Sequence, residues 1–123
     1  MTRGALLLAV AVAVLVAGRA DALDRWTWQD TAWEAGFAAL VLVDVGQTRW
    51  AMQNGWEEGN PLLGKHPTDT QLNTLAVAVP LAHAAVSTLL PAGPWRRGWQ
   101  VFTVGVEAHA VYRSYSIGVK VAF

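Results

Sequence analysis

Three long apolar segments, each with a narrow stripe of polar residues, constrain this chain more than any other feature of its sequence. The segments cover residues of about 31–51, 69–90 and 95–117. Within each segment the polar residues recur every three or four positions, which places them on one face of a helix. The stripes contain Asp30, Glu34, Asp44 and Thr48, then Asn73, His83 and Ser87, then Gln100, Thr103, Glu107 and Ser114. A helix of a soluble protein has the inverse pattern, an apolar stripe on a polar cylinder.

The inverted pattern predicts helices that expose apolar side chains to lipid and turn their polar ones toward each other, because polar groups in a bilayer must pair. Tryptophans gather at the ends of the segments, where amphipathic rings anchor helices at a membrane interface. Trp33 and Trp50 are 17 positions apart, which is about 25 Å of helix. We therefore expect an all-α fold, a compact antiparallel bundle of three mostly transmembrane helices, or four with the N-terminal segment.

The first 22 residues have the layout of a secretory signal peptide. Arg3 supplies the positive start, an apolar run covers residues 5–17, and Ala20-Asp21-Ala22 places small residues where a signal peptidase cleaves. The alternative for residues 1–22 is an uncleaved N-terminal anchor helix. In both cases the chain is directed to the export machinery, and residues 23–123 are expected to form a single helical membrane domain.

Charge and cysteine content exclude several classes of function. Nine Lys plus Arg balance nine Asp plus Glu among the 123 residues, and a neutral chain without a basic stripe is not expected to bind nucleic acid. The absence of cysteine excludes thiol chemistry, Cys-ligated zinc and iron–sulfur clusters. No motif of a named reaction is present. We therefore expect no catalytic residue and no cofactor, and the sequence favours a protein that is not an enzyme.

Local patterns predict where the helices begin and how the chain ends. Thr31–Glu34 and Thr68–Gln71 both have capping-box spacing, a hydroxyl residue followed three positions later by an acid or amide. Residues 115–123 alternate like a strand, but no other segment does, which argues against a membrane barrel. We expect a frayed helix end or a short extended tail there.

Asp44, His83 and Glu107 lie near the centres of the three segments. Ionisable groups at the middle of a bilayer are unfavourable by about 2.5–3.5 kcal/mol each, so three at one depth predict a common buried polar cluster. Thr48 adds a hydroxyl one turn from Asp44. The favoured interpretation is polar pairing that fixes how the helices align, because no opening or metal motif accompanies these residues. The alternative is an intramembrane ion-binding or proton-binding site.

The most specific motif is Asp44-Val45-Gly46-Gln47-Thr48 followed by Glu58-Gly59-Asn60-Pro61-Leu62-Leu63-Gly64. Over roughly residues 30–116 the chain resembles an uncharacterised group of small membrane proteins of bacteria and their phages that carry this signature. In that group an Asp/Thr pair ends one helix, and a Glu-x-Asn-Pro turn leads to the next. The resemblance implies a helix-end and turn motif at Gln47, Glu58, Asn60 and Pro61, and it implies no activity. We expect Glu58 and Asn60 to fold back on the helix end, with Pro61 restricting the turn.

The sequence favours a small non-enzymatic integral protein of the cell inner membrane. Its role would be that of an accessory or structural subunit of an envelope complex, or of a phage-encoded envelope protein. Its partners would be the lipid bilayer and another membrane protein or a second copy of the chain. Two alternatives stay open: the intramembrane ion or proton site described above, and a soluble three-helix binding module in the periplasm.

Overall fold

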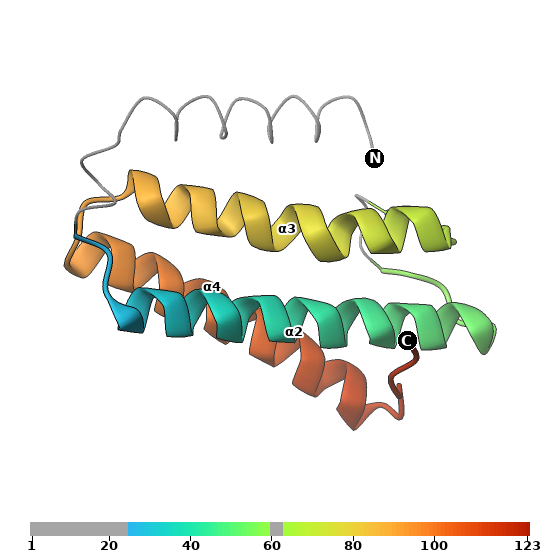
Figure 1. The fold of residues 1–123 in the computed structure, drawn as a ribbon. Coiled ribbons are helices and arrows are strands. Elements are labelled where there is room, and N and C mark those ends of the chain that lie inside the picture. The colour runs from blue at the N-terminus through green and yellow to red at the C-terminus, as the bar shows by residue number, and fades with distance from the viewer. Residues whose placement is uncertain (1–24, 60–62) are drawn as a thin grey trace.

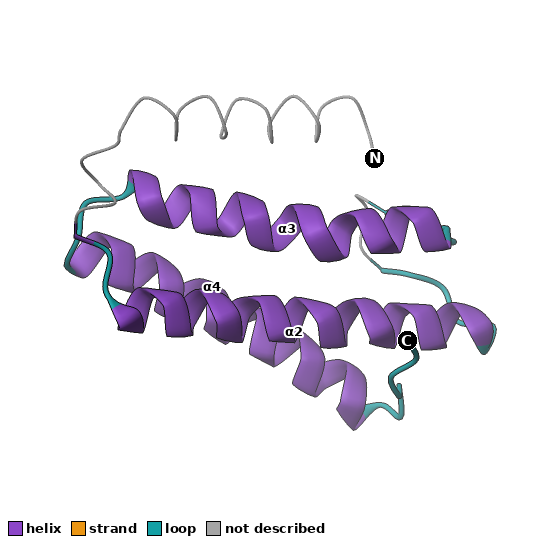
Figure 2. Ribbon diagram, in the orientation of Figure 1, coloured by secondary structure: helices purple, strands orange, loops and turns teal. Residues whose placement is uncertain are grey.

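Three helices, each antiparallel to the next, form the part of the chain that the computed structural model describes, residues 25–59 and 63–123. They are α2 (Trp28–Gln53), α3 (Asp69–Leu89) and α4 (Pro94–Ser116) (Figure 1). These residues contain no strand (Figure 2). The prediction of an all-helical, three-helix bundle is therefore confirmed. The expected signal peptide or anchor, residues 1–22, lies outside the described residues.

Helix α2 is the centre of the arrangement, because it packs against both other helices along its length, whereas α3 and α4 make few contacts with each other. The start of α2, the end of α3 and the start of α4 meet at one end of the bundle (Figure 1). Helix α4 begins close to α3 and diverges from it toward the opposite end, whereas its contact with α2 continues as far as Val111 (Figure 1). The first end therefore brings together residues from all three helices, and the polar interior is concentrated there.

The two expected capping boxes have different outcomes. The box at the start of α3 is confirmed, because the backbone N–H of Thr68 donates to the Gln71 side chain at 2.8 Å and the Thr68 hydroxyl accepts from Gln71. The box expected at Thr31 is wrong. Helix α2 begins four residues earlier than this box implies, with Thr27 as the N-cap residue and Asp30 as its partner. The Thr31 hydroxyl instead accepts a hydrogen bond from the indole of a neighbouring tryptophan.

The C-terminal tail leaves α4 and folds back onto α2, as an extended segment that begins at a left-handed glycine, Gly118. The backbone N–H of Ala122 donates to the carbonyl of Gly46 at 2.9 Å, and Val119 is buried. A Cβ at Gly46 would lie 2.6 Å from the Val121 side chain and 3.1 Å from the carbonyl oxygen of Ala122. The glycine of the Asp-x-Gly-Gln-Thr motif is thus where the tail closes on the helix.

Replacing Gly46 with alanine should release this tail. The added methyl group overpacks the contact, so we expect a loss of about 1–3 kcal/mol in the free energy of unfolding and faster hydrogen exchange at the amide of Ala122. Gly36→Ala is the matched control in the same helix, because nothing lies within 4 Å of the Cβ it would add. It should be neutral or stabilising. Unchanged protection of the tail amide in Gly46→Ala would contradict this role.

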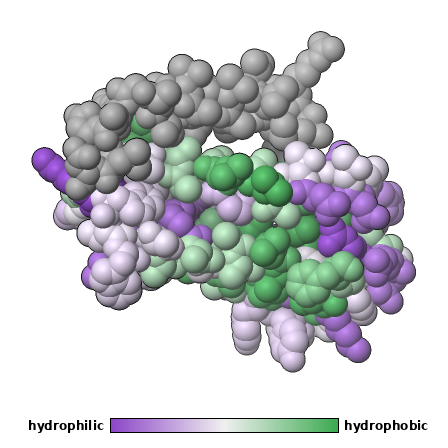
Figure 3. Space-filling view, viewed as in Figure 1, coloured by the Kyte–Doolittle hydropathy of each residue, from purple (hydrophilic) through white to green (hydrophobic). Residues whose placement is uncertain are grey.

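The surface of the bundle carries many large apolar side chains. The most exposed on the helices include Val77 and Leu81 on α3 and Phe102, Tyr112 and Tyr115 on α4, each more than 60% exposed. In the face shown in Figure 3, hydrophobic residues gather over the middle of the molecule, and strongly hydrophilic ones gather toward the edges. The described part of the chain therefore presents an apolar outer surface.

By length and composition, α3 alone among the described helices qualifies as a candidate membrane span. Only 17% of the residues in its most apolar window are buried inside the bundle, unlike the core helix of a soluble protein. Helices α2 and α4 contain several charged residues and do not qualify. The expectation of three spanning helices thus goes further than composition supports.

Candidate functional site

The interior of the bundle is unusually polar for so small a fold. Among the described residues the buried polar or charged side chains are Asp30, Gln47, His83, Ser87, Arg96 and Gln100, and the buried apolar ones are no more numerous. Buried polar groups are stable only when they are hydrogen-bonded. Most of these residues belong to the polar stripes that the sequence predicted to face inward. They are connected to one another in two successive layers.

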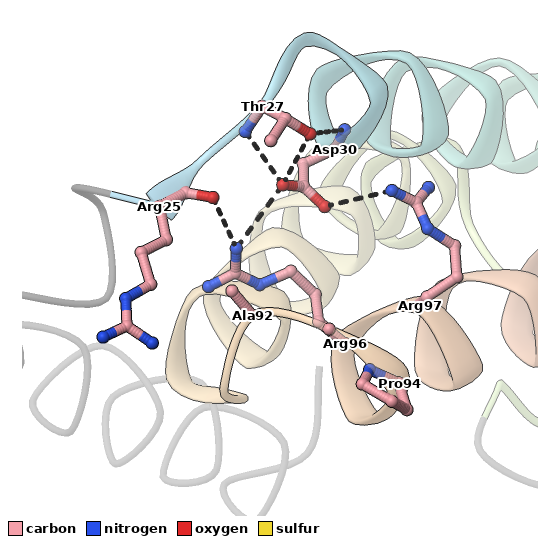
Figure 4. Close-up of a pocket in the computed structure, with 8 residues that line it drawn as sticks. Arg25, Thr27, Asp30, Ala92, Pro94, Arg96 and Arg97 are labelled. Atoms are coloured by element: carbon pink, nitrogen blue, oxygen red, sulfur yellow. Dashed lines mark hydrogen bonds and ion pairs between the residues drawn. The ribbon is translucent and has the colours of Figure 1, made fainter.

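The first layer lies at the shared end of the three helices and is built on Arg96, whose side chain is almost fully buried. Its Nε donates to the carbonyl of Ser87 at 2.8 Å, and its Nη2 donates to the carbonyl of Leu90 at 3.1 Å. Its Nη1 lies 3.4 Å from the carboxylate of Asp30 (Figure 4). Asp30 also accepts from Gln100 at 3.2 Å. Arg96 therefore joins the end of α3 to the starts of α2 and α4.

The second layer is centred on Glu34, one turn further along α2. One carboxylate oxygen accepts from His83 Nδ1 at 2.6 Å. The other accepts from the Ser87 hydroxyl, and from Gln100 Nε2 at 3.3 Å. On the far side of the imidazole, Nε2 lies 2.6 Å from the Thr103 hydroxyl. The carboxylate of Glu34 is thus the acceptor that connects α2 to both other helices.

The His83 ring is enclosed as well as hydrogen-bonded. Phe37 stacks on the ring with a centroid distance of 3.8 Å, and Trp99 stacks at 5.0 Å. The order carboxylate, imidazole, hydroxyl is that of a hydrolytic triad. However, aromatic rings cover the imidazole, and the Thr103 hydroxyl also lies 2.7 Å from the carbonyl of Trp99, to which it can donate. This enclosure favours a structural network over a reactive one.

Asp44 and Glu107 form a separate pair between α2 and α4, nearer the opposite end of the bundle. Their side chains are half-buried and close enough to interact with each other. Two carboxylates this close repel each other when both are ionised. The carboxylate of Glu58 is close enough to interact electrostatically with Asp44, and it accepts from the Thr48 hydroxyl at 2.9 Å.

The expected cluster of Asp44, Thr48, His83 and Glu107 is therefore divided. The structure brings Asp44 together with Glu107, but His83 lies in the second layer with Glu34. Glu34 and Asp44 are ten positions apart, which corresponds to about 15 Å along a helix. The antiparallel arrangement explains this separation. His83 lies after the midpoint of α3 and is therefore nearer the first end of the bundle. Asp44 lies after the midpoint of α2, which runs the other way, and is therefore nearer the opposite end.

The structure describes two of the four residues of the helix-end and turn motif, Gln47 and Glu58. Glu58 folds back onto α2 through Thr48, as expected. The side-chain amide of Gln47 donates to the carbonyl of Val111 at 3.0 Å, so this residue connects α2 to α4. Asn60 and Pro61 lie outside the described residues. The described part of the motif is a set of contacts that hold α2, α4 and the tail together.

The main residues absent from the predicted site are Glu34 and Arg96. The spacing from Thr31 predicts that Glu34 closes a helix cap, but in the structure Asp30 closes the cap of α2. Arg96 follows the turn-forming residues Pro91-Ala92-Gly93-Pro94, and its position in the sequence does not indicate burial. The sequence does contain a signal for this site, because Asp30, Glu34, Ser87 and Gln100 all belong to the polar stripes. A short connection also places the end of α3 beside the start of α4.

No protein-family model matches the chain, and comparisons with curated proteins and with solved structures found none similar to it.

Proposed function

We propose that the chain is a small integral protein of the cell inner membrane, with a non-enzymatic role as an accessory or structural component of a bacterial or phage-derived envelope complex. One observation carries this proposal: the described bundle buries ionisable and amide side chains and exposes large apolar ones. Water favours the opposite distribution, because apolar surface leaves water and charges remain in it. Lipid favours the distribution found here.

The charged residues that lower the hydropathy of α2 and α4 are consistent with insertion, because most of them have partners inside the bundle. Asp30 and Glu34 on α2 are each bonded to another helix, with Arg96 on α4 among their partners, and Asp44 lies close to Glu107 on α4. Ionisable residues in membranes usually face the bundle interior and pair in this way. Helix α3 carries the apolar surface expected of a span.

An accessory role is supported by the nature of the polar network. Its two layers connect all three helices, and the imidazole at its centre is covered by aromatic rings. Such a network fixes one arrangement of helices, which suits a protein whose outer surface contacts lipid and a membrane partner or a second copy. A shared ion or proton site on Asp44, His83 and Glu107 has less support, because His83 is bonded to Glu34 instead.

Cell fractionation tests the proposal. The full chain should pellet with membranes, resist extraction by alkaline carbonate and high salt, and dissolve in mild detergent. Release with the osmotic-shock fluid would contradict membrane insertion and support a soluble periplasmic module. Co-purification in mild detergent tests the accessory role. A lone monomer in several detergents would count against that role without affecting the membrane assignment.

A further inference from the structure

A pocket of about 340 Å³ opens at the end of the bundle where the three helices meet. Its volume is within the range of small-ligand sites, about 300–1,000 Å³. The walls come from the N-terminal approach to α2, from the connection between α3 and α4, and from the first turn of α4 (Figure 4). The pocket lies beside the first layer of the polar network, so its walls are held by the Arg96 contacts described above.

The charged groups that face this pocket are mostly cationic. They are the guanidinium groups of Arg96 and Arg97 and the carboxylate of Asp30, so two positive charges minus one negative charge leave a net charge of +1. Arg25 contributes its backbone carbonyl, which accepts from Arg96, and its side chain points away (Figure 4). Arg96 is committed to Asp30 and to backbone carbonyls. The Arg97 side chain is 38% exposed and lies 3.8 Å from the same carboxylate. The excess charge is thus presented by Arg97, the side chain that a ligand can reach.

The first turn of α4 adds to the positive electrostatic potential of the pocket. Gly93 is the N-cap residue and provides no side-chain cap, and the first turn contains no acid. Helices α2 and α3, in contrast, both begin with a capping box and an acidic residue. The positive end of the α4 dipole is therefore not offset by its own sequence, and it borders a pocket that already has excess positive charge.

Tryptophans surround this end of the bundle. The guanidinium of Arg96 lies 5.3 Å from the ring centroid of Trp26, and that of Arg97 lies 5.7 Å from the ring of Trp33. Trp28 and Trp95 are each 75% exposed. Amphipathic rings of this kind gather at the depth of lipid headgroups. If the bundle spans a bilayer, the pocket lies at the depth where phosphate groups are found.

We propose that this pocket binds a phosphate group, and that the phosphate belongs to the headgroup of an anionic lipid. Arginine matches phosphate geometry through paired N–H donors, and basic pockets at the ends of membrane helices recognise anionic headgroups. The lipid source rests on the proposed membrane location. The phosphate chemistry rests only on the pocket, and a soluble phosphomonoester shares that chemistry.

Binding to the purified full-length chain in a neutral detergent tests the site. The probes are phosphatidylglycerol, diacylglycerol with the same acyl chains, and soluble glycerol phosphate, and the readouts are thermal stabilisation and native mass spectrometry. Phosphatidylglycerol should bind and diacylglycerol should not. Arg97→Gln should weaken binding roughly tenfold, the effect of losing a charge-assisted hydrogen bond. Arg113→Gln, an exposed arginine at the other end of α4, should bind like the unmodified chain.

Equal binding of diacylglycerol and phosphatidylglycerol would overturn the proposal, and so would unchanged binding in Arg97→Gln. Binding of glycerol phosphate alone would confirm the phosphate site and assign its ligand to a soluble source. This design separates the two proposals. A chain that leaves the cell with the osmotic-shock fluid fails as a membrane protein, whereas its arginine pocket is still tested by glycerol phosphate.

Discussion

Replacing Arg96 with methionine should lower the free energy of unfolding by about 3–5 kcal/mol, the effect expected when one partner of a buried ion pair is removed. The side chain is 1% exposed. Its loss would leave the Asp30 carboxylate buried without its closest arginine, and would leave the carbonyls at the end of α3 without their donor. Thermal or detergent-induced unfolding of the purified chain, followed by circular dichroism, measures the change.

A double substitution distinguishes the loss of this ion pair from the general destabilisation caused by changing a buried residue. Adding Asp30→Asn to Arg96→Met removes the uncompensated charge, so the double variant should be more stable than Arg96→Met alone. Arg113→Met, on the exposed end of the same helix, should change stability by less than about 0.5 kcal/mol. A loss below about 1 kcal/mol in Arg96→Met would show that Arg96 does not hold the three helix ends together.

Replacing Glu34 with alanine should be destabilising by about 2–4 kcal/mol, because several buried donors would lose an acceptor at once. Those donors are His83 Nδ1, the Ser87 hydroxyl and Gln100 Nε2. Glu34→Gln keeps the shape and one acceptor oxygen, so it should retain much of the stability. Unfolding curves for the two variants, compared under the same detergent conditions, give the difference.

Glu57→Ala is the control for Glu34→Ala, because Glu57 is an exposed glutamate outside the helices and makes only long ion pairs near 3.8 Å. It should have little effect. Equal and small losses in Glu34→Ala and Glu34→Gln would mean that the second layer contributes little to stability. The polar interior would then need another explanation, such as a role in binding.

The positions of the helices could be predicted from sequence because helix-capping and helix-breaking residues separate the apolar segments. The capping box at Thr68 marks the start of α3, and Gly93-Pro94 marks the start of α4. The start of α2 could not be fixed in the same way. Thr27–Asp30 and Thr31–Glu34 have equivalent spacing, and only the tertiary partners of Glu34 decide between them. Local sequence was therefore sufficient to place a helix start where only one capping box was present.

Which polar residues pair could not be predicted, although their inward orientation could. The stripes on the three helices were evident, and their members at the first end are buried. Pairing depends on how far each residue lies from the shared end of the bundle. His83, four positions after residue 79 at the centre of α3, therefore meets the first third of α2 and not Asp44. The centres of the three segments therefore do not predict which residues pair.

The docking of the C-terminal tail is another feature that only tertiary structure reveals. Its alternating sequence indicated an extended segment, but nothing in that pattern names a partner. The partner is the backbone of α2 at Gly46, where the absent side chain leaves room for close approach. The same glycine lies inside the most specific motif of the sequence. The motif therefore has a packing role in addition to any role that the resemblance implies.

The account depends most on the claim that the apolar outer surface contacts lipid, and single-cysteine labelling tests this directly. The chain has no cysteine, so Leu81→Cys on α3, Phe102→Cys on α4 and Lys65→Cys in the exposed connection each introduce one thiol. Open membrane fragments are treated with a water-soluble maleimide before and after detergent denaturation. Lys65→Cys should react in both conditions, and Leu81→Cys and Phe102→Cys only after denaturation. Reaction of these two thiols at the rate of Lys65→Cys in intact membranes would contradict lipid contact.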